Sequence, residues 1–275
     1  MLSSDEQNRI YQQAYVPEHL PDYVAAVSGS EPYLFQDYLC YFHRNHLIFI
    51  GYPLADNPAE ISRAYPAACE RFNPHTIVLV ADEQLPLPQG DDTQPPDRYY
   101  RLNLPLKSLS PDVAYMVRRA ERELKIEVGQ FGREHKKIIK NFIGRQDLSD
   151  AQIHIFKHIK NYMKRSKTAH LLEARKADRL VAFSIVDTGS ARYAFYQFNF
   201  RSARITVPGA SDLLLNEMVR LAQSAGKQAI NLGLSIHPGI RRFKQKWGGE
   251  PFLNHHSVFI QRSQTPDIGN LSRKL

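Results

Sequence analysis

Hydrophobic residues recur along the chain with two spacings, one typical of strands and the other of helices. Three short apolar runs and one partly alternating run in the first 110 residues predict strands, at 38–42, 47–51, 76–81 and 99–104. Apolar residues near helical spacing follow Pro58 and predict a helix to about residue 71. A proline-rich acidic segment at 82–97 predicts a loop.

The remainder of the chain carries the same two patterns. Helices are predicted to begin at Ser110 and Ser149 and to cover residues 212–225, and strands are predicted at 170–175, 180–186, 192–200 and 228–232. Strict alternation in the third of these strands would place Ala194, Tyr196 and Phe198 on one face and Tyr193, Phe195, Gln197 and Asn199 on the other.

The composition is that of a folded protein with room for two modest domains. The chain has 275 residues, of which 43% are hydrophobic and 11% aromatic. Its apolar runs are far shorter than a membrane span, and residues 1–15 lack the apolar core of a secretory signal, so we expect a cytoplasmic protein. Cys40 and Cys69 show no metal-ligand spacing, and we expect free thiols and no metal site.

Charge is distributed unevenly along the chain. Residues 1–110 hold 7 basic and 14 acidic side chains, residues 111–170 hold 14 and 7, and residues 171–275 hold 15 and 7. A polyanionic partner would therefore contact the second and third segments. A phosphate-rich cofactor, a transfer RNA and an anionic membrane surface all fit this distribution.

Two motifs in the last third of the chain suggest chemistry. Pro208-Gly209-Ala210-Ser211-Asp212 opens a helix, and the backbone N–H groups of such a turn can hold a phosphate, with Ser211 as the expected helix cap. After the next strand comes Pro238-Gly239-Ile240-Arg241-Arg242-Phe243-Lys244-Gln245-Lys246-Trp247, a basic helix.

This order of elements resembles the FemAB-like and phosphatidylglycerol lysyltransferase-like (DUF2156) families, whose fold is related to that of the GNAT acyltransferases. The arginine-rich Arg118-Arg119-Ala120-Glu121-Arg122 is similar to a helix in the middle of these families. The resemblance implies an α+β fold of tandem GNAT-like (acyl-CoA N-acyltransferase) halves, with mixed sheets flanked by helices. We expect lobes at residues 1–145 and 146–275, the second carrying the donor site.

The resemblance also implies where the reactants bind. In GNAT-like folds the strands on either side of the phosphate turn diverge, and the donor enters the gap between them. The expected donor-binding residues are Arg204, Val207, Gly209, Ala210, Ser211, Arg241 and Phe243. Asn231, Ser235 and His237 follow the strand that leads to the reacting groups, and we expect them on the acceptor side. Valine replaces the first glycine of the usual turn, and Pro208 has no N–H, which counts against a standard acetyl-CoA site.

Three residues are candidates for catalysis. Phe243-Lys244 match a Phe-Lys pair of the Fem-like transferases, and a lysine there would stabilise the oxyanion of a tetrahedral intermediate. Glu173 and Tyr196 are suited by type to assist proton transfer. No Ser-His-Asp, Cys-His or paired-carboxylate pattern is present, which agrees with direct attack of an acceptor on a bound activated ester.

The predicted function is transfer of an acyl or aminoacyl group to an amine or hydroxyl. The donor substrate would be aminoacyl-tRNA or acyl-CoA, and no metal is implied. The sequence carries no membrane segment, and the basic charge allows peripheral contact with a membrane. The alternative is a non-catalytic GNAT-like module that binds RNA or another polyanion.

Overall fold

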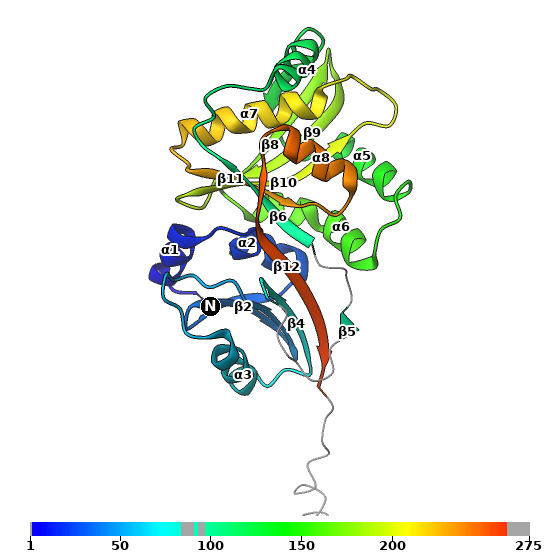
Figure 1. Ribbon diagram of the computed structural model, residues 1–275. Coiled ribbons are helices and arrows are strands. Elements are labelled where there is room, and N and C mark those ends of the chain that lie inside the picture. Colours follow the sequence, from blue (N-terminus) through cyan, green and yellow to red (C-terminus); the bar gives the residue numbers. More distant parts are fainter. Residues whose placement is uncertain (1, 84–90, 93–96, 263–275) are drawn as a thin grey trace, which may run out of the picture.

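The computed structural model describes residues 2–83, 91–92 and 97–262. An acidic loop was predicted at 82–97, and its residues 84–90 and 93–96 lie outside the described ranges. The described strands form one mixed sheet in the order β1-β2-β3-β4-β12-β6-β11-β10-β9-β8-β7, and β5 (Asp91–Asp92) pairs with β12 beside this path. Figure 1 shows the sheet as an upper and a lower half with helices packed against each. The architecture is the α+β class expected from the sequence.

The lower half begins with an antiparallel meander. It is formed by β1 (Glu31–Phe35), β2 (Tyr38–His43) and β3 (His46–Ile50). The helix α3 (Ile61–Phe72) then leads to β4 (Thr76–Ala81), which pairs in parallel with β3. The buried face of α3 packs with the inward side chains of these strands into a core of its own. β2, β3 and β4 were predicted from the sequence, whereas β1 was not.

Three short helical segments precede the first strand and connect the two halves. They are α1 (Ser4–Gln13), the 3-10 helix η1 (Pro17–His19) and α2 (Pro21–Ser28). α2 packs against α6 (Asp150–Arg165) of the upper half, and Tyr23 on α2 contacts both Tyr162 and Phe198 there. None of these three helical segments was predicted from the sequence.

The upper half contains the remaining strands of the sheet. These are β6 (Asp97–Asn103), β7 (Lys125–Val128), β8 (Ala169–Lys176), β9 (Arg179–Asp187), β10 (Tyr193–Arg201) and β11 (Ala229–Leu234). Their helices are α4 (Pro111–Glu121), α5 (Arg133–Ile143), α6, α7 (Ala210–Ser224) and α8 (Pro238–Lys246). Ser110 and Ser149 cap α4 and α6 as predicted.

Helices cover both faces of the upper half, so two hydrophobic cores lie on either side of one sheet. α4 and α7 pack on one face, where Leu214 and Met218 are buried against Ala194 and Ile230. α5 and α6 pack on the other face, where Ile159 is buried with Phe183. The apolar side chains of α7 therefore belong to the core on one face of the sheet.

The last strand, β12 (Glu250–Gln261), belongs to both halves of the sheet. Its first residues pair with β6, up to His255 opposite Asp97, and its last residues pair with β4, beginning with His256 opposite Ala81 (Figure 1). No strand was predicted here from the sequence, because this segment has no regular alternation of apolar and polar residues.

The strand pairing bears on how the chain divides into lobes. β6 and β7 come before residue 145 in sequence, yet β6 pairs with β11 and β7 pairs with β8. The predicted boundary near residue 145 stays a prediction, and residues 97–143 lie in the upper half of the sheet.

Candidate functional site

Each half contains a parallel pair of strands joined by a helix, and the two pairs differ in one respect. β3 and β4 pair over five residues, from His46 with Thr76 to Ile50 with Val80. β10 and β11 pair over three residues only, from Tyr193 with Ala229 to Phe195 with Asn231. Beyond this point β10 continues to Arg201 and β11 to Leu234 without pairing with each other. The upper half therefore has a gap between the strands where the lower half has none.

A bulge in β10 accompanies the gap and corrects one prediction. The register with β9 shifts between Tyr196 and Phe198, so the alternation of faces is interrupted at Gln197. Tyr196 packs on the α7 side of the sheet, whereas Phe198 packs on the α6 side. The two side chains were predicted to share a face, and they do not, because a bulge adds one residue to the strand.

Lys244 lies beside this gap. Its Nζ donates to the backbone oxygens of Gly233 and Leu234, at 2.6 and 2.5 Å, at the end of β11. The side chain is only 3% exposed, and burial lowers the pKa of Lys244 to about 7, an effect that the negative charge of Asp97 opposes. A Cβ added at Gly233 would lie 3.7 Å from the carbonyl oxygen of Tyr196 and 3.8 Å from Nζ. The ammonium therefore lies close to both diverging strands.

Tyr196 belongs to a chain of polar side chains that leads from the sheet to the start of α7. The Ser184 hydroxyl donates to the Tyr196 hydroxyl at 3.5 Å and accepts from Asn199 Nδ2 at 2.8 Å. Ser211 donates to Asn199 Oδ1 at 2.9 Å. Burial is the main reason why the pKa of Tyr196 lies above its usual value. Tyr196 is thus a neutral phenol at the edge of the gap.

The start of α7 differs from the predicted phosphate turn. Gly209 is the N-cap, with a φ of 83°, and Ser211 instead contacts Asn199. A Cβ at Gly209 would lie 2.2 Å from the backbone oxygen of Met116, so the glycine is required for the close approach of α4. The amide of Ala210 already donates to the Val207 carbonyl, at 3.2 Å.

An acidic side chain also lies in the first turn of α7. Asp212 is buried, and its Oδ1 accepts from Lys246 Nζ at 2.5 Å and from Trp247 Nε1 at 2.9 Å. These contacts join α8 to α7. They also place a carboxylate next to the amides that would have to hold a phosphate, which makes the turn a poor anion site.

The predicted acceptor-side residues have structural partners. Asn231 is buried, donates to the Tyr15 carbonyl at 2.8 Å and accepts from the Gly233 amide at 2.8 Å. Ser235 is buried and donates to Asp97. His237 is exposed and caps α8 by accepting from the Gly239 amide at 3.0 Å. Asn231 lies within β11, Ser235 and His237 follow its last residue, and the acceptor-side role of all three stays a prediction.

Asp97 was not predicted as part of this region, and it holds the loop after β11. Its Oδ2 accepts from the Ile236 amide at 2.6 Å, and Ile236 has a φ of 41°, a strained conformation for a β-branched residue. Burial raises the pKa of Asp97, but hydrogen bonds from Ser235, Ile236 and Arg98 outweigh it, and the pKa lies below its usual value.

Glu173 lies apart from the other candidate residues. It is buried on β8, where its carboxylate contacts Arg175 Nε at 2.6 Å and His135 Nε2 at 3.0 Å. β9 separates β8 from β10, and Glu173 contacts α5 on the face opposite Tyr196. The structure therefore places the Lys244 ammonium near the backbone of Tyr196, whose hydroxyl contacts Ser184 instead, and it does not bring Glu173 to them.

The predicted donor-binding side chains fall into two groups. Val207 and Ala210 are buried in the α4–α7 core, and Phe243 is half-buried against it. Arg204 and Arg241 are exposed, as are Arg201 and Arg242. Arg201 is the last residue of β10 and Arg204 follows it, whereas Arg241 and Arg242 lie in α8, which follows β11.

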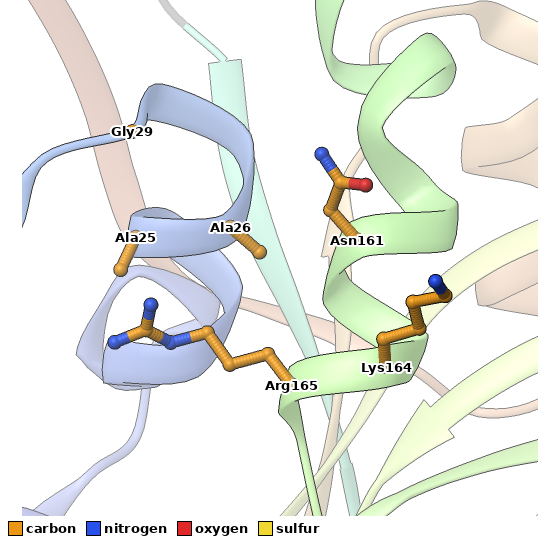
Figure 2. Close-up of a pocket in the computed structure, with 6 residues that line it drawn as sticks. All are labelled: Ala25, Ala26, Gly29, Asn161, Lys164 and Arg165. Atoms are coloured by element: carbon orange, nitrogen blue, oxygen red, sulfur yellow. The ribbon is translucent and has the colours of Figure 1, made fainter.

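The upper half also carries a shallow surface groove between α2 and α6. It is lined by Ala25, Ala26, Gly29, Asn161, Lys164 and Arg165, and Figure 2 shows the small residues of α2 facing the polar side chains of α6. Arg165 Nε contacts Asp22 Oδ1 at 3.0 Å. The groove contains none of the residues predicted to be functional.

Membrane-spanning helices and metal-binding clusters are both absent from the part of the chain that the structure describes. Within it, no helix is long and apolar enough to cross a membrane. The same residues include no group of three or more histidine, cysteine, aspartate or glutamate side chains placed to hold a metal ion.

Comparison with solved structures identifies the fold. No protein-family model and no curated protein matches the chain in sequence. L-PGS from Bacillus licheniformis superposes with a TM-score of 0.60 at 12% identity, covering 98% of this chain and 95% of that one. FemX gives 0.60 at 11% identity, covering 100% and 98%. A tandem GNAT protein from the clavulanic acid biosynthesis pathway gives 0.51 at 12% identity, covering 83% and 79%.

These identities are low, so the likeness concerns the fold. It confirms the tandem GNAT-like fold and, at the level of the fold, the resemblance to the FemAB-like and DUF2156 proteins.

Proposed function

We propose that the protein transfers an aminoacyl group from aminoacyl-tRNA to an acceptor bound at the gap between β10 and β11. The observation that carries this proposal is the contrast between the halves, because the parallel strands stay paired in one and separate in the other. A gap in a sheet exposes backbone groups that a bound extended substrate can satisfy. FemX and L-PGS have the same fold, which supports group transfer in general.

Lys244 is the group best placed to stabilise charge at this gap. A protonated lysine has three N–H donors, and two are used by Gly233 and Leu234. The third would donate to the carbonyl oxygen of the transferred group as negative charge develops on it. The Tyr196 hydroxyl contacts Ser184 on β9, the strand on the other side of β10 from the gap, so the proposal gives neither Tyr196 nor Glu173 a part in the reaction.

The turn before α7 favours tRNA over acyl-CoA as the donor. Pro208 has no N–H, Ala210 donates to Val207, and Asp212 places a carboxylate in the first turn of the helix. A pyrophosphate would find few free donors there. The four exposed arginines and a basic surface on α5 and α6 suit a longer polyanion. This basic surface consists of Lys136, Lys137, Lys140, Lys157, Lys160 and Lys164.

Binding of a charged tRNA, measured against ionic strength, tests the proposal. Reversing Lys157 and Lys164 to glutamate should weaken binding about tenfold or more at low salt and reduce the salt dependence. The matched control is Arg63→Glu with Arg71→Glu, two exposed positions on α3 that should leave binding unchanged. Transfer of a radiolabelled aminoacyl group to an added amine is the activity measured in parallel.

Three results would contradict the proposal in different ways. Binding of acetyl-CoA without binding of tRNA would show that the donor is acyl-CoA and not aminoacyl-tRNA. Binding of tRNA with no transfer to any acceptor would favour the non-catalytic module that the charge distribution also allows. Equal loss of affinity in the α3 control would show that net charge, and not the α5 and α6 surface, determines binding.

A further inference from the structure

A carboxylate lies between the two halves without a positively charged partner. Glu18 is half-buried in η1, and its Oε2 accepts a hydrogen bond from the Tyr99 hydroxyl at 2.8 Å. Tyr99 lies on β6 opposite Leu234, the last residue of β11. The carboxylate therefore reaches the end of β11, where that strand has already parted from β10.

The surroundings of Glu18 are aromatic, and Asp22 and Asp82, whose charges act on two of the same tyrosines, are also negative. Among the described residues Glu18 forms no ion pair, and the groups whose pKa its charge raises are Tyr23, Tyr41, Tyr52 and Tyr99. His19 and His255 pack against Tyr52 and Tyr99, and burial lowers the pKa of each histidine to about 4. Both histidines are therefore neutral near pH 7, and burial raises the pKa of Glu18 itself.

This arrangement lowers the stability of the folded protein, and the fold does not require it. A desolvated carboxylate without a cation is unfavourable, whereas a glutamine would accept the Tyr99 hydrogen bond without a charge. On β10, Gln197 Nε2 is buried at the bulge without a hydrogen-bond partner. Unsatisfied groups of this kind are typical of binding sites.

Glu18 and Lys244 approach the gap from opposite faces of the sheet. Tyr99 and Tyr100 are consecutive on β6 and point to opposite faces. Tyr99 contacts Glu18, and the Lys244 ammonium lies 5.7 Å from the centre of the Tyr100 ring. A negative group and a positive group therefore lie on opposite faces of β6, the strand that pairs with β11 beside the gap.

We infer that Glu18 binds the acceptor as an ammonium and then takes its proton, which makes the acceptor a primary amine. The inference rests on the proposed transferase function. A carboxylate bordered by tyrosine rings attracts an ammonium by charge and by cation–π contact, and a neutral hydroxyl would gain neither. Lys244 on the other face would act on the carbonyl of the donor.

The proposed reaction conserves protons and electron pairs at each step. Glu18 removes one proton from the ammonium, and the amine lone pair attacks the ester carbon and forms the C–N bond. The tetrahedral intermediate collapses as the C–O bond to the tRNA ribose breaks. The second amine proton leaves to solvent, and the proton on Glu18 passes to the departing ribose oxygen, which restores the carboxylate.

Binding of a small amine without any donor tests the site. In protein labelled with ¹³C at the glutamate carboxyl carbons, n-butylammonium should shift the Glu18 resonance to saturation, and n-butanol should not. The effect should disappear as the pH falls through the pKa of Glu18, because protonation removes the charge that attracts the ammonium. The Glu18→Gln variant assigns the resonance.

The chain offers a matched control in Glu31, an exposed glutamate whose Oε2 accepts from the Tyr33 hydroxyl at 3.0 Å. Its resonance should not respond to n-butylammonium. Near pH 8, Glu18→Gln should be at least as stable to heat as the unaltered protein, because it removes an unpaired buried charge. A clear loss of stability would show that Glu18 has a structural role, and an equal response to n-butanol would also overturn the inference.

The test of amine binding at Glu18 can fail or succeed independently of the test of aminoacyl transfer. Saturable binding of n-butylammonium at Glu18 without transfer from any donor would leave the amine site in place and remove the transferase function. If transfer to an amine is observed, Glu18→Gln should lower turnover about 100-fold, the usual size of a general-base effect. Unchanged turnover would overturn the role of Glu18 alone.

Discussion

At the scale of single residues, the position of Lys244 changes what the sequence pattern suggested. A lysine on a basic helix would ordinarily extend into solvent, as Arg241 and Arg242 do. Lys244 instead turns inward and donates to two carbonyls at the end of β11. Gly233 and Leu234 lie beyond the last residue pair between β10 and β11, so the lysine bonds to backbone oxygens at the point where these strands have separated. Its structural and chemical roles therefore cannot be separated by activity alone.

The pH dependence of stability tests the lowered pKa of Lys244 without any measurement of activity. The pKa of Lys244 falls to about 7 on folding, from an ordinary value near 10.5, so the unfolded chain binds an extra proton between these values. Stability should then rise with pH from about 7 to about 10, relative to a Lys244→Met variant that cannot titrate. Thermal unfolding of both proteins across this range is the measurement. Parallel curves would show that Lys244 keeps its ordinary pKa in the folded protein.

The sequence identified part of this group of residues and missed part of it. Lys244 and Tyr196 were predicted, because one lies in a recognisable motif and the other on an aromatic strand. Asp97 and Glu18 were not, because each lies in a segment without a motif and is far in sequence from the residues it contacts. Only the pairing of β6 beside β11 brings either carboxylate to the gap.

At the scale of elements, the contact between α4 and α7 depends on a glycine that the sequence suggested was there for phosphate binding. Gly209→Ala would place a Cβ 2.2 Å from the Met116 carbonyl oxygen. Gly226 is a matched control, because its φ of 66° is also positive and no atom lies within 4 Å of its added Cβ. Alanine should cost about 1–2 kcal/mol at Gly226 from backbone strain. It should cost about 1–3 kcal/mol more at Gly209 from overpacking. Chemical denaturation of both variants measures the difference.

Equal losses of stability in the Gly209 and Gly226 variants would mean that α4 moves freely. The contact between α4 and α7 would then not fix the start of α7. The comparison also shows why a large residue such as glutamate at Gly209 is a poor probe of ligand binding. Such a change would disturb the packing of two helices before any ligand is added.

Regular elements were predicted well, and irregular ones were not. β4 was predicted with the bounds Thr76–Ala81 because it is a short β-branched run. The bulge at Gln197 left no trace in the pattern, since one extra residue in a strand that is buried on both faces changes no periodicity. β12 escaped prediction because its neighbours change along its length, from β6 to β4, and with them the faces that are buried.

At the scale of the whole molecule, the shared strand β12 should make the two halves unfold together. Its residues pair with β6 up to His255 and with β4 from His256, so neither half can lose its sheet without exposing a strand of the other. Two buried hydroxyls add to this connection. Tyr52 OH donates to the Asn254 carbonyl at 2.6 Å, and Tyr41 OH donates to the Glu18 carbonyl at 2.7 Å.

The chain contains natural probes for each half, which makes this testable without labels. The only tryptophan, Trp247, is buried at the end of α8 in the upper half. The only cysteines, Cys40 and Cys69, are buried in the core of the lower half, and burial raises the pKa of both thiols. Tryptophan fluorescence and thiol reactivity, followed in the same urea series, should therefore report the same midpoint. If the thiols react at a urea concentration that leaves the fluorescence native, the halves are independent domains joined by a flexible strand. The contacts of the upper half alone would then have to hold β10 and β11 apart.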